Sequence, residues 1–315
     1  MASVHKAPRY PIPDAAGNDA TAALHSAKKP SWFSILMVLF KARVVSLLLF
    51  AAVGGAFIGA GHWPGWRVLG LTLLTGWLSA SGASALNQYI ERKSDGDMTR
   101  TRHRPLVNGD IPNPAWVPWV ALAMIALGMA VAWPFSHALA FWLGMGAFIY
   151  VLVYTIWLKP RTPLNIVIGG AAGSAAVLSG AAAAGHWNAP GALVLALLVF
   201  LWTPSHFWSL AIVYRNDYAR SDTPMLPVMV TPRQAAFWVF LHTAATAYAA
   251  LMLALDPALS WIYFVPVGIA TVDMLLRNLR LLVVVTPKNA RSLFIASNMY
   301  LAVVLVMLCV DVMMR

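Results

Sequence analysis

The sequence contains almost no cysteine and very little negative charge. Cys309 is the one cysteine among 315 residues, which excludes an internal disulfide and any metal cluster built from several thiolates. Only 11 residues are Asp or Glu, and charged residues of both signs make up 10% of the chain. Hydrophobic residues make up 60%, and the mean hydropathy is +0.70. This balance excludes an ordinary soluble domain and indicates a membrane protein.

Apolar segments of about 20 residues recur along the chain, and each is long enough to cross a hydrocarbon layer about 30 Å thick. We therefore predict an all-α, polytopic membrane protein with nine transmembrane helices. The first two exceed the thickness of the layer, so they must tilt or extend beyond it. The predicted helices span 33–60, 66–90, 115–134, 137–157, 164–185, 190–214, 234–255, 258–280 and 292–313.

The N-terminal residues differ in composition from the rest of the chain. Residues 1–30 contain Pro, Ala and Lys but no apolar stretch, so they lack the apolar centre of a signal peptide. We expect them to form a disordered cytoplasmic tail. The remaining residues, 31–315, are predicted to form a single intramembrane domain.

Basic residues are distributed very unevenly under this nine-helix scheme. With the N-terminus in the cytoplasm, 20 of the 22 Lys and Arg residues fall on the cytoplasmic side, and only Arg67 and Arg315 fall on the other. Such an excess is the positive-inside pattern of membrane proteins. It predicts the orientation, and it explains the net charge of +11 without a nucleic-acid partner.

The few acidic residues are concentrated rather than scattered. Carboxylates beside a membrane helix are costly, so by default they indicate a functional site. Six of the 11 acids fall in two polar loops on the predicted cytoplasmic side: Glu91, Asp95, Asp97, Asp110, Asp217 and Asp222.

Asn87, Glu91 and Asp95 recur every four residues at the end of the second predicted helix. On a helix, this spacing keeps the three side chains within about 80° of one another, over roughly 12 Å of axis. Amide and carboxylate oxygens suit Mg²⁺, which also binds substrate phosphate oxygens. The pattern therefore predicts a metal site at the membrane face, whereas Asp97 lies on another face and is expected to be solvated.

Arginines follow the acids closely, at Arg100, Arg102 and Arg104. Their planar guanidinium groups are suited to bidentate contact with phosphate. Acids and arginines within 20 residues therefore indicate a phosphate substrate held through a metal. Taken alone, however, the basic residues fit a positive-inside loop equally well.

The second polar loop and the segment before the fifth helix offer further candidates. Asp217 could bind a second metal or orient a diphosphate if it faces the first cluster. Lys159 adds positive charge at the same membrane face, while Arg161 fits an interface anchor at least as well. The remaining polar candidates are Asn165, Tyr214 and Tyr218.

His206 is the histidine of most interest because it lies inside an otherwise apolar helix, two turns before Tyr214. An imidazole there could bind a haem iron or shuttle a proton. It could equally be a packed histidine in a helix interface.

Three blocks of sequence resemble the UbiA-type intramembrane prenyltransferases and, within them, the protohaem IX farnesyltransferase (haem O synthase) branch. The resemblance extends from about Phe40 to the last predicted helix. The first block is NQYIERKSDGDMTRTRHRPL at 87–106, and the second is YTIWLKPRTPLNIVIGG at 154–170. The third is WTPSHFWSLA at 202–211, which is followed by Asp217-Tyr218 and by PMLPV at 224–228.

The chain departs from the family pattern at three places. Glu91 stands where the Asn/Asp-x-x-x-Asp pattern has Asp, and it is a longer ligand that should still coordinate. Ala175-Ala176 replace a usual Pro pair, and Ser221-Asp222 stand where Ala-Gly is common. We expect these changes to alter local geometry and not the assignment.

The resemblance implies a central cavity that opens to the cytoplasmic side, with Mg²⁺ as cofactor. It implies farnesyl diphosphate as donor and haem B as acceptor, giving haem O for haem-copper oxidase assembly, with a haem A synthase as downstream partner. The lipid bilayer would be the bacterial cytoplasmic membrane, or the mitochondrial inner membrane in a eukaryote. The implied metal ligands are Asn87, Glu91, Asp95 and Asp217. The implied diphosphate and substrate contacts are Arg100, Arg104, Lys159, Asn165, His206, Tyr214 and Tyr218.

Two other functions remain open at this point. A prenyltransferase acting on a quinone precursor or on chlorophyllide would share the acidic clusters but not the second and third blocks. A cation-coupled transporter would place carboxylates near the middle of the bilayer, whereas these cluster at one face.

Overall fold

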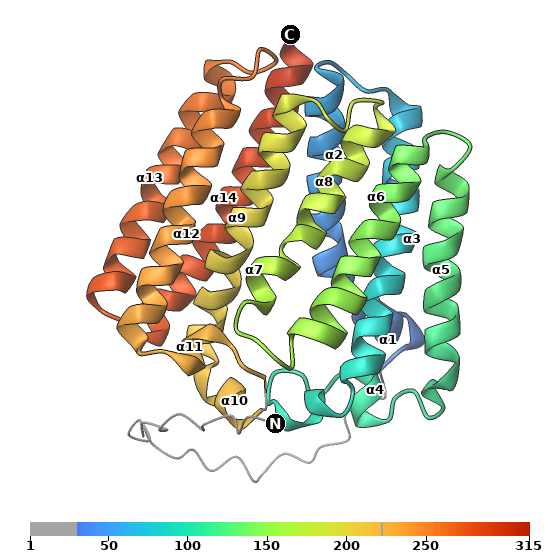
Figure 1. Ribbon diagram of the computed structural model, residues 1–315, viewed down its shortest axis with the longest axis vertical. Coiled ribbons are helices and arrows are strands. Elements are labelled where there is room, and N and C mark those ends of the chain that lie inside the picture. Colours follow the sequence, from blue (N-terminus) through green and yellow to red (C-terminus); the bar gives the residue numbers. More distant parts are fainter. Residues whose placement is uncertain (1–29, 222) are drawn as a thin grey trace.

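The computed structural model describes residues 30–221 and 223–315, which form one bundle of long helices and contain no β-strand (Figure 1). The predicted disordered tail and Asp222 lie outside the described residues, apart from Pro30. The polar loops, with the short helices α4 (Pro105–Asn108), α10 (Arg215–Arg220) and α11 (Leu226–Met229), lie at one end of the bundle. The C-terminus lies at the other end.

Nine helical segments of the described chain are long and apolar enough to cross a membrane, as predicted. Two of these segments each consist of two successive helical elements. These are the segment formed by α6 (His137–Phe148) and the π-helix η3 (Ile149–Leu158), and the segment formed by α7 (Asn165–Gly169) and α8 (Ala171–Ala183). The others are α2 (Ala42–Ala60), α3 (Trp66–Glu91), α5 (Val117–Ala132) with its leading turn η2 (Pro114–Trp116), α9 (Pro190–Val213), α12 (Pro232–Leu253), α13 (Trp261–Val283) and α14 (Pro287–Met314).

The prediction of one continuous first helix at 33–60 is wrong. Helix α1 (Trp32–Leu39) ends before Lys41, and α2 begins after it. Lys41 adopts the left-handed conformation, with φ at 48°, and is the one non-glycine residue with positive φ in the described chain. This conformation costs an L-residue roughly 1–2 kcal/mol, so it persists only where the surroundings impose it. Contacts of the Lys41 side chain, described below, supply that constraint.

Small residues allow α2 and α8 to pack backbone against backbone. A Cβ atom added to Gly180 would lie 1.7 Å from the carbonyl oxygen of Ala52, and one added to Gly55 would lie 2.0 Å from that of Val177. Neither position can therefore accept a side chain without moving a helix. Small residues at such positions allow helices to approach closely.

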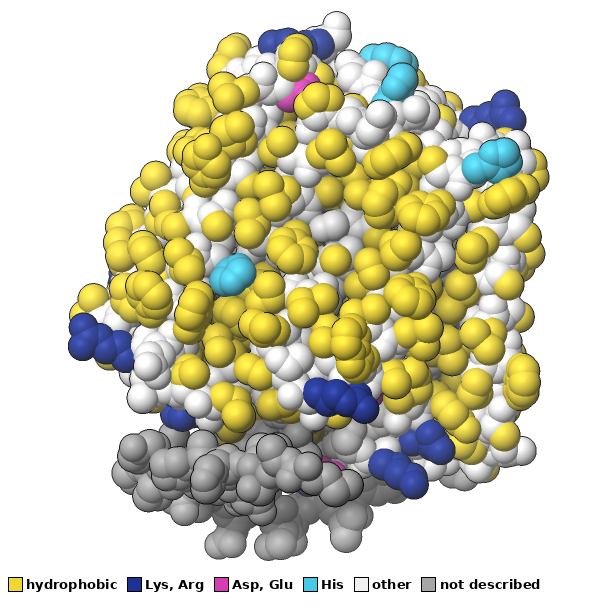
Figure 2. Space-filling model, in the orientation of Figure 1, with side chains coloured by type: hydrophobic (Ala, Val, Ile, Leu, Met, Phe, Trp, Pro, Cys, Tyr) yellow, Lys and Arg dark blue, Asp and Glu magenta, His cyan; other side chains and the backbone are white. Residues whose placement is uncertain are grey.

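The outer surface has the pattern expected of a membrane protein. On the face drawn in Figure 2, hydrophobic side chains cover the middle, and most Lys and Arg lie toward the end that carries the polar loops. Exposed aromatic residues such as Trp66, Trp119 and Trp261 lie at the first turns of their helices. Such aromatic side chains favour the membrane interface.

One buried acid serves the fold and not a site. The carboxylate of Asp311, in α14, accepts hydrogen bonds from the backbone N–H groups of Ser260 and Tyr263 and from the Ser260 hydroxyl, at 2.6 to 3.0 Å. These groups begin α13, where the first N–H groups of a helix lack partners within it. Asp311 therefore caps a neighbouring helix.

Candidate active site

The acidic cluster is buried at the polar end of the bundle, but it is not one face of one helix. Asn87 and Glu91 lie on the last turns of α3, and they are 2% and 7% exposed. Asp95 lies beyond the end of α3, on the short 3₁₀ helix η1 (Ser94–Asp97), and is 4% exposed. The prediction that a continuous helix aligns all three is therefore wrong for Asp95, because the chain leaves the α-helix at Arg92 and turns back.

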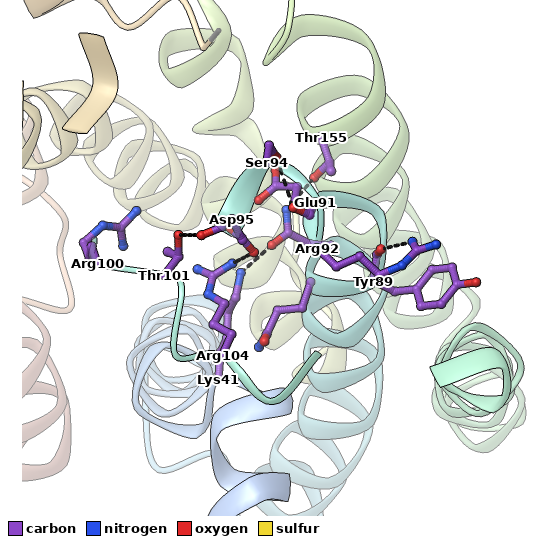
Figure 3. A network of polar contacts seen from close by, with 12 residues as sticks. Lys41, Tyr89, Glu91, Arg92, Ser94, Asp95, Arg100, Thr101, Arg104 and Thr155 are labelled. Carbon is purple, nitrogen blue, oxygen red and sulfur yellow. Dashed lines mark hydrogen bonds and ion pairs between the residues drawn. The ribbon is translucent and has the colours of Figure 1, made fainter. Parts of the chain in front are cut away.

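Each buried carboxylate is paired with a basic side chain. Glu91 Oε1 lies 2.6 Å from Nζ of Lys159. The carboxylate of Asp95 accepts a hydrogen bond from Arg104 (Figure 3). Thr101 donates to the backbone oxygen of Asp95 and holds η1 in place. These pairs join four separate segments of sequence at one point, so the cluster depends on tertiary structure.

Lys41 is a member of this cluster that sequence reasoning missed. Its Nζ donates to Oδ1 of Asn87 at 2.5 Å and to the Tyr150 hydroxyl at 2.9 Å. The sequence analysis counted Lys41 only among the basic residues of the cytoplasmic side. The break between α1 and α2 turns its side chain into the bundle, and no local pattern predicts that break.

The two lysines differ in their electrostatic surroundings. Burial, together with the nearby charge of Arg104, lowers the pKa of Lys41 to about 7. Burial also disfavours the charged form of Lys159, but Tyr154 and Glu91 outweigh it and raise its pKa.

The two polar loops meet, as predicted, through the residues around Asp217. Asp217 accepts hydrogen bonds from the hydroxyl of Thr99 at 2.9 Å and from Arg220 at 2.5 Å. Arg100 Nη2 lies 3.4 Å from the hydroxyl of Tyr218. Asp217 thus belongs to a second cluster, joined to the first by the chain between Asp95 and Arg104.

Other predicted residues have different positions. Asn165 is fully buried and donates to the backbone oxygens of Thr162 and Pro224, so it ties the start of α7 to the second polar loop. Its Oδ1 has no partner among the described residues. Tyr214 is exposed at the end of α9. Arg161 donates to the carbonyl oxygens of Ile156 and Trp157 near the end of η3.

The donor set of the first cluster fits a hard cation. Asn87 Oδ1 and the carboxylates of Glu91 and Asp95 are oxygen ligands of the kind that Mg²⁺ prefers. All three already accept from ammonium or guanidinium groups, which shows that they can stabilise positive charge. Within the described residues, however, no three His, Cys, Asp or Glu side chains lie close enough together to hold a metal. Asp217 is therefore not gathered with Glu91 and Asp95.

His206 lies away from both clusters, in the interface between α9 and α14. Its ring stacks between Trp202 and Phe294, at centroid distances of 4.3 and 4.6 Å. Its Nδ1 lies 2.8 Å from the hydroxyl of Ser297. The same hydroxyl lies 2.8 Å from the carbonyl oxygen of Phe294.

An apolar cavity of about 150 Å³ adjoins the first cluster. It is enclosed by α2, α3, α6, α8 and α9, and small residues such as Ala83, Gly146, Ala176 and Ser179 make room for it. Tyr150 lines the cavity and also binds Lys41 through its hydroxyl. The polar cluster and the apolar cavity therefore meet at this tyrosine.

Comparison with known proteins identifies relatives over nearly the whole chain. The sequence pattern of the UbiA prenyltransferase family matches residues 47–304. Protoheme IX farnesyltransferase 1 of Saccharopolyspora erythraea is 40% identical over 309 residues, covering 94% of this chain and 95% of that protein. The protoheme IX farnesyltransferase of Thermus thermophilus is 38% identical over 92% of this chain, which spans 48% of that longer protein.

Solved structures share the fold at low sequence identity. A structure of digeranylgeranylglyceryl phosphate synthase superposes with a TM-score of 0.75 at 13% identity, covering 90% of this chain and 99% of that one. A UbiA homologue from Archaeoglobus fulgidus, bound to DMAPP and Mg²⁺, superposes with a TM-score of 0.63 at 18% identity. The alignment covers 88% of this chain and all of the homologue.

Proposed function

The chain belongs to the UbiA prenyltransferase family, and from this premise we propose that it transfers a farnesyl group from farnesyl diphosphate to a vinyl group of haem B. The allylic C–O bond of the donor breaks and diphosphate leaves. A C–C bond forms to the vinyl group, and water adds its hydroxyl to the resulting haem-side cation and releases a proton. The product is haem O, which a downstream haem A synthase would consume.

The junction at Tyr150 is the structural observation that carries this proposal. On one side of it lie Lys41, Asn87 and the paired carboxylates, and on the other lies the apolar cavity. A prenyl diphosphate has the same division into a charged end and an apolar chain. The name shared by the relatives, which extend over at least nine-tenths of this chain, selects farnesyl as the donor and haem as the acceptor.

We propose different roles for the individual residues of the two clusters. Asn87, Glu91 and Asp95 would hold Mg²⁺, with Asp217 joining from the second cluster. When bound, the metal supplies positive charge that stabilises the leaving diphosphate. Lys159 and Arg104 would contact the diphosphate oxygens, since both already lie at the carboxylates that would take the metal. Arg100 and Tyr218, which lie together in the second cluster, would contact it from there.

The apolar cavity would hold part of the farnesyl chain and keep water from the reacting carbon. An apolar cavity of about 150 Å³ accommodates a molecule the size of benzene, which is roughly one isoprene unit. The rest of the chain must therefore lie toward the cavity mouth, or the helices must move apart. Exclusion of water protects the allylic cation until the vinyl group attacks it.

The function is tested with the purified protein, haem B, farnesyl diphosphate and Mg²⁺. We expect a product with the mass of haem O, formed only when all three are present. Parallel reactions replace haem B with 4-hydroxybenzoate or chlorophyllide. Prenylation of one of these with no haem O would show that the acceptor is wrong while the prenyltransferase chemistry is right.

We further propose that the N-terminus and both polar loops face the cytoplasm. In a Cys309→Ala background, single cysteines at Asn108 and Thr231 should react with an impermeant thiol reagent only from the cytoplasmic side, and a cysteine at His62 only from the opposite side. All three positions are exposed, in loops at opposite ends of the bundle or at a helix cap. Labelling of Asn108 and His62 from the same side would contradict this topology.

A further inference from the structure

The segment that faces Asn87 from across the site is a π-helix and not an α-helix. Ten residues, Ile149–Leu158, form η3, and the N–H of Lys159 donates to the carbonyl of Tyr154, five residues earlier, at 2.8 Å. π-Helical segments are rare and occur frequently at functional sites. A π-helix of ten residues is therefore unusual, and its presence here needs a structural explanation.

The π-helix brings together side chains that an α-helix would separate. Residues five apart lie about 140° from one another around an α-helix, whereas they are neighbours on a π-helix. Tyr150 and Thr155 are five apart, and both contact the Lys41–Asn87 pair. Tyr154 and Lys159 are also five apart, and the Lys159 ammonium lies 5.9 Å from the Tyr154 ring centroid. Through Thr155 and Lys159, one residue of each pair, this segment contacts Asn87 and Glu91 of α3.

The hydrogen bonds around Asn87 allow only one orientation of its amide. As an ammonium group, Lys41 can only donate, so the atom that faces it is then Oδ1. Thr155 donates its single hydroxyl proton to the carbonyl of Tyr150 at 2.7 Å, so it can only accept from Asn87. The Nδ2 of Asn87 accordingly donates to Thr155 Oγ1 at 3.0 Å. Both neighbours therefore require the same orientation.

We propose that Thr155 is a positioning residue that keeps Oδ1 of Asn87 directed at the cation site. Without the Thr155 acceptor, Lys41 alone holds the amide in this orientation, and the buried Nδ2 loses its partner, so the orientation is held less firmly. A turned amide presents N–H groups, which cannot ligate a metal. This inference rests on the proposed function, because it assumes that Asn87 is a ligand of the divalent cation.

The test compares Thr155→Val, which keeps the shape but removes the acceptor, with Thr155→Ser, which keeps the hydroxyl. Mn²⁺ binding to the purified protein is measured by electron paramagnetic resonance, without substrates. We expect Thr155→Val to weaken Mn²⁺ binding about tenfold, the lower end of the range for residues that orient metal ligands. Thr155→Ser should bind Mn²⁺ nearly as the wild type does.

A matched control separates orientation from general damage to a buried helix. Thr246→Val removes a buried hydroxyl in α12 that bonds only to the carbonyl of His242 in its own helix. It should leave Mn²⁺ binding unchanged, with thermal stability similar to that of Thr155→Val. Equal Mn²⁺ binding by Thr155→Val and wild type would overturn the role of Thr155. Absence of Mn²⁺ binding by the wild type would instead overturn the metal site of the proposed function.

Discussion

Asp95→Asn is expected to lower kcat/KM for farnesyl transfer by about 100-fold or more, because it removes a charge that holds the cation at the diphosphate. The amide keeps the shape of the carboxylate, so packing on η1 should be preserved. Chelation of divalent metal in the wild-type protein should abolish turnover in the same way. Rates are measured as haem O formed per minute across a range of Mg²⁺ concentrations.

Asp97→Asn is the matched control, since Asp97 lies on the same 3₁₀ helix but is exposed. It should retain near-normal activity. Asp95→Asn also leaves Arg104 without its partner, so thermal unfolding of both variants shows whether the fold is retained. Near-normal activity of a folded Asp95→Asn protein at low Mg²⁺ would show that Asp95 is not a metal ligand.

His206→Ala is expected to raise the KM for haem B about tenfold or more, with little change in the KM for farnesyl diphosphate. We propose that His206 contacts the iron or a polar edge of the acceptor, and a tenfold loss of binding corresponds to about 1.4 kcal/mol. The proposed diphosphate contacts lie elsewhere, at Arg100, Arg104 and Lys159. Both constants are measured at saturating Mg²⁺.

Two further variants make this result interpretable. His206→Phe keeps an aromatic ring between Trp202 and Phe294 but has no lone pair, so it should show the same defect with less loss of packing. Arg104→Ala should show the opposite bias, a raised KM for farnesyl diphosphate, since a guanidinium is lost beside Asp95. Unchanged haem absorption and KM in His206→Phe would mean that His206 only packs two helices.

Patterns with a strong local cause were predictable from the sequence. The nine spans follow from apolar segment length, and the position of Asn87 and Glu91 on one face follows from their spacing of four. The break at Lys41 was not predictable, because no proline or glycine marks it. The placement of Asp95 on the same helical face as Asn87 and Glu91 was wrong, because the spacing of four continues after the helix has ended.

The partners of each side chain could not be derived from the sequence. Lys159 was assigned to a phosphate and not to Glu91, and Asp217 was grouped with acids that it does not touch in the structure. The role of Thr155 was also hidden. It depends on a π-helix, whose five-residue register leaves no signal in an evenly apolar segment such as Ile149–Leu158.

The sequence by itself determined that this protein is a nine-helix membrane protein of the UbiA family with an acidic cluster at one end. These properties follow from hydrophobic length, charge distribution and motifs that are continuous in the chain. Only the tertiary structure decided which bases pair with which acids, that Lys41 enters the site, and which way the Asn87 amide faces. The physical reason is that hydrogen bonds and ion pairs act over about 3 Å, and those distances are set by helix ends, registers and crossings.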